Sequence, residues 1–98
     1  MAIKSFRDKA TEDINYGRST KPALRKLPKE LHKKAQVKLA RLGAACSLDD
    51  LRGLRGNRLE VLGGDRRGQF SIRINDQYRI CFYWDEQNAC EVEIVDYH

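Results

Sequence analysis

The feature that most constrains the fold is a stretch of alternating apolar and polar residues within Gly64–Trp84. Residues 69–74 and 77–84 form two alternating runs, and Asn75 and Asp76 join them. Successive side chains of a strand point to opposite faces, so each run predicts a half-buried β-strand. Because Asn and Asp tolerate the positive φ angles of tight turns, the two runs predict a β-hairpin with a two-residue turn.

The two faces of this hairpin differ in chemistry. One face predicts part of a core and carries Phe70, Ile72, Ile74, Tyr78, Ile80, Phe82 and Trp84. The opposite face, which we name the arginine face, carries Ser71, Arg73, Arg79, Cys81 and Tyr83. Arg73 and Arg79 flank the turn and are expected to be neighbours across the hairpin. Like charges directly opposite destabilise a sheet unless an anion lies between them, which favours a bound phosphate.

Helices are predicted in the first half of the chain. Asp8 is a candidate N-cap for a short helix that Gly17 ends. A longer helix is predicted from Leu27-Pro28 to just before Gly43, with proline in its first turn and glycine just past its end. The apolar stripe of this helix consists of Leu31, Ala35, Leu39 and Leu42, while lysines, Arg41 and a solvent-exposed His32 occupy its other sides.

The segment between these helices, residues 17–27, is polar, basic and interrupted by Pro22, and it predicts a mobile loop. Further strands are predicted at 58–62 and 90–95, with a short edge strand at 3–6. Helices followed by an antiparallel meander predict an α+β fold of two layers, in which the N-terminal helices pack on an antiparallel sheet. The length of 98 residues predicts a single domain covering 1–98.

The charge of the chain is unevenly distributed. Its formal net charge is +5, yet residues 1–45 hold 12 Lys and Arg against 4 Asp and Glu, and residues 84–98 hold 5 acidic residues and no basic one. All lysines lie at or before Lys38, and only arginines follow. Arginine grips phosphate with fixed geometry, whereas lysine is a mobile charge suited to long-range attraction. The distribution favours a nucleic acid or an acidic protein as partner.

Several classes of protein are disfavoured by what the sequence lacks. No apolar run approaches the ~20 residues that a membrane span needs, and the charged N-terminus has no signal segment, so a cytoplasmic protein without membrane contact is expected. The three cysteines show no CxxC spacing and are expected to be small buried hydrophobes. His32 and His98 lie far apart, so we expect neither a metal site nor a cofactor.

The candidate site residues converge on the predicted meander and the end of the chain. The cations are Arg58, Arg66, Arg67, Arg73 and Arg79, and their possible partners are Glu60, Tyr83, Asp96, Tyr97 and His98. Histidine is the side chain best suited to exchange a proton near neutral pH, which makes His98 a candidate acid or base. The residues alone leave open whether the protein cuts RNA, binds nucleic acid without cutting, or binds an acidic protein.

Three motifs in combination resemble one known family. They are GDRRG at 64–68, SIRINDQYR at 71–79 and EIVDYH at 93–98. Together they are similar to the HigB toxins of the RelE-like superfamily, also known as plasmid maintenance killer proteins, and the resemblance covers the whole chain. It implies a RelE-like fold and the toxin of a type II toxin–antitoxin system.

The resemblance also implies an activity and partners. The expected activity is that of an mRNA interferase, a metal-independent endoribonuclease that cleaves translated mRNA in the ribosomal A site and so inhibits translation and growth. Its ribose 2′-hydroxyl attacks the adjacent phosphodiester, which restricts the reaction to RNA. The expected partners are the ribosome, mRNA and a HigA-like helix-turn-helix antitoxin, with operator DNA reached only through that antitoxin.

Residue roles follow from the resemblance position by position. Arg73 and Arg79 are expected to stabilise the scissile phosphate, and Asp96, Tyr97 and His98 match the functional terminus of the family. Glu60 and His98 remain alternative general bases. The residues expected to bind flanking phosphates or ribosomal RNA are Arg58, Arg66, Arg67, Lys33 and Lys34. The basic helix and residues 17–27 are an alternative surface for the antitoxin.

The chain departs from the family pattern at two positions. Some HigB toxins have histidine where Glu60 stands and lysine where Gly63 stands. This departure supports an alternative function, in which the chain is a weak or inactive member that acts mainly as a nucleic-acid-binding or regulatory subunit with its antitoxin.

Overall fold

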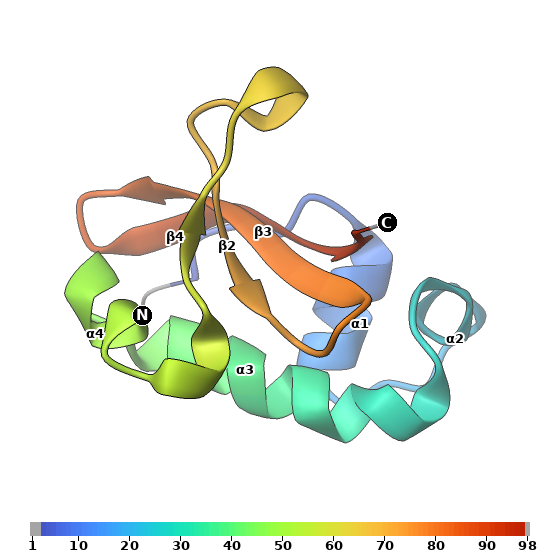
Figure 1. Ribbon diagram of the computed structural model, residues 1–98. Helices are drawn as coiled ribbons and strands as arrows, with labels where there is room; N and C mark the ends of the chain where they lie inside the picture. The colour runs from blue at the N-terminus through green and yellow to red at the C-terminus, as the bar shows by residue number, and fades with distance from the viewer. Residues whose placement is uncertain (1–2, 98) are drawn as a thin grey trace.

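The computed structural model describes residues 3–97 and shows helices packed against an antiparallel sheet (Figure 1). The helices are α1 (Lys9–Asn15), α2 (Lys21–Lys26), α3 (His32–Ala44) and α4 (Leu48–Arg52), with single 3-10 turns at η1 (Lys29–Leu31), η2 (Arg55–Asn57) and η3 (Gly64–Arg66). The strands are β1 (Glu60–Val61), β2 (Phe70–Arg73), β3 (Tyr78–Asp85) and β4 (Asn88–Asp96). None of the described helices combines the length and the apolar character that crossing a membrane requires.

The sheet is a meander with the strand order β1-β2-β3-β4, as the sequence predicts. In the β2–β3 hairpin, Ile72 pairs with Ile80 and Arg73 pairs with Arg79. The predicted two-residue turn is wrong, because Ile74 N donates a hydrogen bond to Tyr78 O at 3.0 Å and residues 75–77 form the turn. The carboxamide of Asn75 closes this longer turn by accepting bonds from the backbone N–H groups of residues 77 and 78.

The core lies between the apolar face of the hairpin and the helices. Ile72, Ile80 and Phe82 are fully buried, and so are Leu39 and Leu42 of α3. Figure 1 shows α1 and α3 on the same side of the sheet. The predicted two-layer α+β fold is confirmed, because the alternating strands and the stripe of α3 present matching apolar surfaces.

Helix α2 corrects the prediction of a mobile loop at 17–27. Thr20 caps the helix by accepting a bond from Ala23 N at 3.3 Å. Pro22 lies in the first turn, where the missing N–H has no intrahelical partner to lose. The buried carboxylate of Asp13 on α1 anchors the segment, since it accepts hydrogen bonds from the side chains of Thr20 and Arg18 at 2.7 and 3.1 Å.

Helix α3 differs from its prediction in extent and in the side chains it buries. It begins at His32, after the 3-10 turn η1, instead of at Leu27-Pro28, and it runs through Gly43 to Ala44 instead of ending before the glycine. His32, expected on the surface, is only 7% exposed, and its Nε2 lies 2.8 Å from the carbonyl oxygen of Leu27. Lys38, also expected on a solvated side, is only 6% exposed.

The two edges of the sheet differ from each other in structure. The predicted strand at 58–62 shortens to Glu60–Val61, because Arg58 adopts a left-handed conformation with φ of 43°. On the other side, residues 3–6 pair with β4 through isolated parallel bridges, Ile3 with Ala89 and Phe6 with Val92. Strand β4 carries a bulge at this place, where Glu91 has φ of 51° and its N–H donates to Ser5 Oγ.

Candidate functional site

The arginine face is the side of the sheet that the helices leave uncovered. The register extends this face onto the outer strands, because Glu60 lies opposite Ser71 and Glu93 lies opposite Cys81. Two predicted site residues, Glu60 and Arg79, are thereby brought together from strands that are not adjacent in the sheet.

Arg79 is the most constrained cation of this face. The residue is 7% exposed, and its Nε donates a hydrogen bond to Ser71 Oγ at 2.7 Å. Its Nη1 lies 3.1 Å from Glu60 Oε1, and its Nη2 donates to the carbonyl oxygen of Arg58. The ring of Tyr97 lies beside the guanidinium, with its centroid 5.7 Å from Arg79 Cζ. A guanidinium fixed in this way binds an anion with little loss of side-chain freedom.

Arg73 lies opposite Arg79 on the backbone, but its side chain has a different environment. It is half-buried and forms an ion pair with Asp76 of the turn. Arg73 and Arg79 each have a carboxylate partner, Asp76 and Glu60 respectively. The two like charges are therefore compensated, and their pairing does not by itself indicate a bound phosphate.

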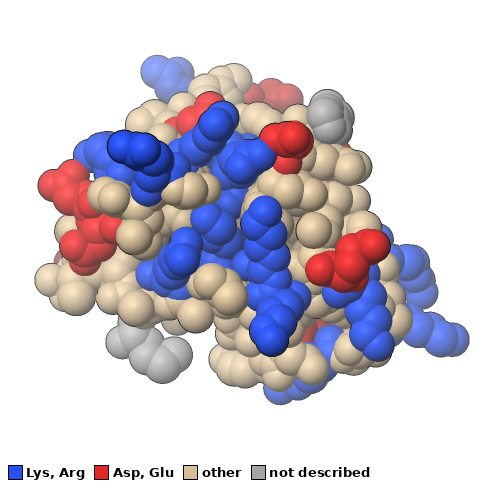
Figure 2. Space-filling view, turned by 60° about the horizontal axis from the view of Figure 1, so that its bottom comes forward, with Lys and Arg blue, Asp and Glu red and all other residues tan. Residues whose placement is uncertain are grey.

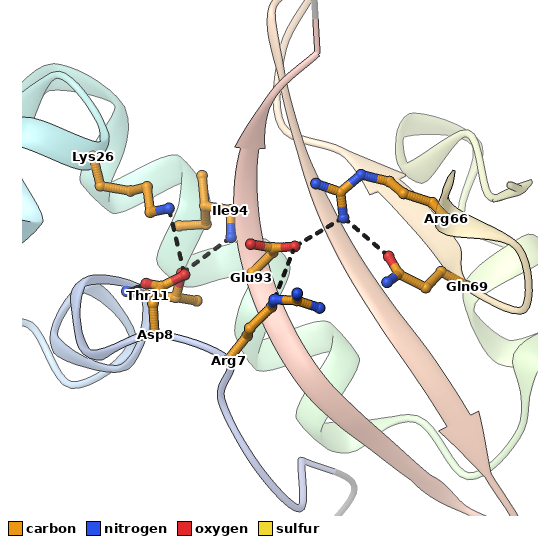
Figure 3. A network of polar contacts seen from close by, with 8 residues as sticks. All are labelled: Arg7, Asp8, Thr11, Lys26, Arg66, Gln69, Glu93 and Ile94. Carbon is orange, nitrogen blue, oxygen red and sulfur yellow. Dashed lines mark hydrogen bonds and ion pairs between the residues drawn. The ribbon is translucent and has the colours of Figure 1, made fainter. Parts of the chain in front are cut away.

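Arg66 was expected to extend from its turn toward RNA, and the structure places it differently (Figure 3). Its Nη1 donates hydrogen bonds to Glu93 Oε1 at 2.8 Å and to Gln69 Oε1 at 3.1 Å. Glu93 also lies 3.8 Å from Arg7 Nε, so the carboxylate stands between two arginines. The hydrogen bond from Arg66 to Glu93 raises the pKa of Arg66 above its ordinary value. Arg66 therefore fastens the turn to β4, while the neighbouring Arg67 is exposed.

The turn that contains Arg66 and Arg67 depends on two glycines. Gly64 and Gly68 have φ of 58° and 91°, a region that side-chain-bearing residues rarely adopt. A Cβ on Gly68 would also contact the ring of Tyr83 at 3.5 Å. Figure 1 shows this turn projecting beyond the sheet, away from α3.

Tyr97 and Asp96, the predicted site residues near the end of the chain, lie in two different environments. Tyr97 is 43% exposed beside Arg79. Asp96 lies opposite Tyr78 in the sheet and accepts a hydrogen bond from Gln77 Nε2 at 3.0 Å. Asp96 also lines a cleft of about 630 Å³ between α2 and β4, together with Arg25, Lys26, Arg66 and other residues. His98 lies outside the described residues.

The other predicted RNA contacts are spread over the surface. The Arg58 side chain is exposed, and Lys33 and Lys34 are exposed on α3. Sequence reasoning assigned no role to Glu93 or Lys38 and did not give Ser71 its hydrogen bond to Arg79. The alternating pattern alone places Glu93 on the arginine face, since it lies between the inward-facing Val92 and Ile94.

The three cysteines differ in burial, and no metal-ligand cluster is found among the described residues. Cys81 is buried, and this burial raises the pKa of its thiol. Cys46 is exposed and Cys90 is half-buried, so the expectation that all three are buried is wrong. Within residues 3–97, no group of three or more His, Cys, Asp and Glu side chains is arranged to hold a metal ion.

Comparison with known proteins gives concordant results. A family model described as the RelE-like toxin of type II toxin–antitoxin system HigB matches residues 4–98. The chain is 43% identical over 84 residues to Toxin HigB-1 of Vibrio cholerae, covering 86% of this chain and 84% of that relative. It is 35% identical over 64 residues to an uncharacterized protein of Haemophilus influenzae, covering 65% and 63% of the two chains.

Two solved structures from Staphylococcus aureus are similar over the full length. The YoeB–YefM complex matches with a TM-score of 0.60 and 20% identity, covering 100% of this chain and 99% of the other. The YoeB dimer matches with a TM-score of 0.58, the same identity and the same coverage. At this identity the likeness concerns the fold, and it confirms the predicted RelE-like architecture.

Proposed function

This chain belongs to the RelE-like HigB toxins of type II toxin–antitoxin systems, and from that premise we propose that it is a ribosome-dependent endoribonuclease that cleaves translated mRNA. The observation that carries the proposal is Arg79. Its guanidinium is fixed on the face of the sheet opposite the core, with the Glu60 carboxylate and the Tyr97 ring beside it. The proposed activity takes place on ribosomes, hence in the cytoplasm.

The proposed reaction needs a base, an acid and a source of positive charge. The base removes the proton of the ribose 2′-hydroxyl, and the resulting O2′ forms a bond to phosphorus. The P–O5′ bond breaks, and the acid delivers a proton to O5′, which leaves a 2′,3′-cyclic phosphate and a 5′-hydroxyl. Negative charge on the phosphorane oxygens is greatest near the transition state, and fixed cations are most effective there.

Arg79 stabilises that charge in the proposed mechanism, and Arg73 assists after release from Asp76. A phosphate bound to Arg79 lies near Glu60, because Glu60 Oε1 is 3.1 Å from Arg79 Nη1. Glu60 is therefore one candidate for the base, and His98 is the alternative base or the acid. Tyr97 stacks on a nucleobase of the RNA next to the cleaved bond, and Asp96 orients the end of the chain through its hydrogen bond with Gln77.

We propose that the reaction uses no metal ion, because arginines and acid–base side chains supply what the chemistry requires. Replacing a non-bridging oxygen of the scissile phosphate by sulfur tests this proposal. Rescue of the slowed cleavage by a thiophilic metal such as Mn²⁺ would contradict it.

The proposed partners follow from family membership. Toxins of these systems are paired with antitoxins, and the fold relative YoeB was solved in complex with YefM. We propose a HigA-like helix-turn-helix antitoxin for this chain, through which it reaches operator DNA. Arg58, Arg67, Lys33 and Lys34 are the proposed exposed contacts to mRNA and ribosomal RNA, while Arg66 acts by holding the turn.

Induced expression without an antitoxin tests the proposed function. Growth arrest is expected, together with new mRNA 5′ ends inside translated codons that appear only when ribosomes translate the message. The matched control is Arg79→Lys, which keeps the charge and loses the fixed geometry. Unchanged mRNA ends at full expression, with RNA binding retained, would favour the alternative of a regulatory, non-cleaving subunit.

A further inference from the structure

Three cations recur at helical spacing on one side of α3, and Arg73 of β2 is near enough to act on one of them. Lys34, Lys38 and Arg41 come from α3, and Arg73 ends β2; we name this group the α3 cation cluster. Each of the other three charges acts on Lys38 strongly enough to lower its pKa. Figure 2, which brings the α3 side forward, shows Lys and Arg side chains in a nearly continuous band with acidic side chains on either side of it.

Lys38 is the fixed member of this cluster. Its residue is only 6% exposed, and its Nζ donates a hydrogen bond to Asn57 Oδ1 at 3.1 Å. Asn57 is itself fully buried and held in place, because its Nδ2 donates to the carbonyl oxygen of Leu51 at 3.1 Å. A Cβ on Gly56 would lie 3.3 Å from Lys38 Nζ, so a glycine is what allows the ammonium group to sit against η2.

The cluster lacks compensating negative charge within the described part of the chain. No described carboxylate forms an ion pair with Lys34, Lys38 or Arg41, and the one pair in the cluster joins Arg73 to the exposed Asp76. Burial is the largest cause of the lowered pKa of Lys38, followed by repulsion from Arg41, Lys34 and Arg73. A buried ammonium among cations is unfavourable alone and becomes favourable when an anion occupies the position between them.

The anion that fits best is a phosphate of the RNA strand. Arg73 belongs to this cluster and pairs with Arg79 across the hairpin, so the cluster lies next to the strand position that carries Arg79. Lys38 uses one of its three N–H donors on Asn57, which leaves donors for the non-bridging oxygens of a phosphate. Lys34 and Arg41 are exposed and can close around a strand that enters from solvent.

We propose that the α3 cation cluster is a second phosphate subsite, which holds the RNA backbone beside the phosphate bound at Arg79, with Lys38 as its buried anchor. The proposal rests on the function proposed above, since it assigns a further part of the same RNA-binding surface. Asn57 is a positioning residue that aims the ammonium group of Lys38.

Binding of a short single-stranded RNA with 2′-O-methyl riboses tests the subsite without cleavage. Lys38→Met keeps the aliphatic stem and removes the charge, and Lys29→Met removes one lysine from η1 outside the cluster. Fluorescence anisotropy is expected to show about tenfold weaker binding for Lys38→Met at low salt, and the slope of log K against log salt should fall by about 0.7 for the lost contact. Equal affinity and slope for the two variants would overturn the proposal.

A titration with inorganic phosphate tests the subsite in the wild-type protein. The buried side-chain amide of Asn57 gives an NMR reporter next to Lys38. We expect its resonances to shift with phosphate and to stay unchanged with chloride at equal ionic strength. No shift up to saturating phosphate would overturn the proposal. Arg41→Gln, at an exposed position, repeats the RNA measurement if Lys38→Met does not fold, and it should also weaken binding.

These experiments separate the subsite from the nuclease. Cleavage by the wild type together with unchanged RNA affinity of Lys38→Met would reject the subsite and leave the proposed function standing. A shift of the Asn57 amide in a protein that never cleaves mRNA would support the subsite and reject the nuclease. Loss of antitoxin affinity with unchanged RNA affinity in Lys38→Met would overturn the proposal and assign the cluster to a protein partner.

Discussion

At the scale of single residues, the contacts of Arg79 fall into those that orient its guanidinium and those that neutralise or cover it. Ser71 and the carbonyl oxygen of Arg58 orient the guanidinium, Glu60 neutralises it, and Tyr97 covers one side. A phosphate that binds here competes with Glu60 for Arg79 and leaves the orienting contacts in place. In the proposed mechanism, binding of RNA thereby frees the Glu60 carboxylate beside the substrate, where a base is needed.

Arg79→Lys tests this assignment. Lysine keeps the positive charge but has no planar fork, so we expect a fall in the rate of mRNA cleavage of about 10²–10³-fold, the usual cost of one fixed donor to a developing oxyanion. The rate on programmed ribosomes is the measurement, with thermal unfolding to check the fold. Arg52→Lys, on the exposed surface of α4, is the matched control. Wild-type rates in Arg79→Lys would remove Arg79 from the mechanism.

Asp13 gives a pH-dependent prediction. The hydrogen bond from the Thr20 hydroxyl is the largest cause that lowers the pKa of Asp13 below 3.8; burial opposes it, and Arg18 and Lys9 add to it. A lowered pKa in the folded state adds stability that is fully present above the unfolded value and is lost as the pH falls through the folded value.

Asp13→Asn should therefore unfold at lower urea concentration than the wild type at pH 7. The gap should narrow as the pH falls below 3.8, the ordinary value for this carboxyl. Asp49→Asn is the control, because its ion pair with Arg52 is exposed and contributes about 0–1 kcal/mol. A gap that is constant from pH 7 to pH 2 would contradict the role of the charge.

Single residues also show where the sequence stops being informative. The alternation predicted that Arg73 and Arg79 share a face and lie near each other across the hairpin, because strand periodicity is a local property. It did not predict that Asn57, 19 positions away in the chain, would receive the ammonium group of Lys38. His32 was missed for a different reason, since its partner is a backbone carbonyl only five positions away, and the pattern of side chains carries no signal for that contact.

At the scale of elements, the bulge in β4 is a point of backbone strain. Glu91 is exposed and has φ of 51°, which costs a side-chain-bearing residue about 1–2 kcal/mol relative to glycine. The N–H of Glu91 binds Ser5 Oγ, and a glycine keeps that bond.

Glu91→Gly should raise the free energy of unfolding by about 0.5–1 kcal/mol, because part of the relief is offset by the greater freedom of glycine in the unfolded chain. Urea unfolding is the measurement. Glu12→Gly within α1 is the opposite control and should lower stability by about 1 kcal/mol. Equal losses in both variants would show that the bulge carries no strain.

Helix α2 shows how an element escapes detection. Its sequence contains Pro22 and four Lys or Arg residues between positions 18 and 26, which favoured a loop. The helix is nevertheless formed, because Thr20 caps it while bonding to Asp13, and because Ala23 and Leu27 are fully buried. Tertiary anchoring exceeded local propensity at this point.

At the scale of the whole molecule, the distribution of charge bears on the proposed encounter with RNA. The net charge is +5, and a band of basic side chains runs over the α3 side (Figure 2). Charges at the rim of an interface act mainly on the rate of association, and salt screens them.

Lys33→Glu should slow association with ribosomes by about twofold to tenfold at low salt, because it reverses one exposed charge of the steering field. The dissociation rate should change little, and the two proteins should converge at high salt. Stopped-flow association across a salt series provides the measurement. A change confined to the dissociation rate would show that Lys33 acts only through the direct contact proposed above and takes no part in steering.

The overall architecture was the part most accessible from the sequence. The periodicity of apolar residues predicts the strands of the meander and α3, and the apolar faces of these elements pack against each other. What remained hidden depends on contacts between distant segments, such as the ion pair of Arg66 with Glu93, 27 positions apart. That pair fastens to β4 the turn in which Arg66 was expected to bind RNA.

The pairing of residues 3–6 with β4 has a consequence for synthesis. Lys4 N donates to Ala89 O and Arg7 N donates to Val92 O, so the earliest described residues are completed by the last strand to be made. During translation, residues 3–6 therefore have no β4 to pair with until late, whereas α1 to α4 are already available to fold. The same late strand leads to Tyr97 beside Arg79. The nascent toxin therefore cannot assemble the whole of its proposed site until residues 88–97 have emerged from the ribosome.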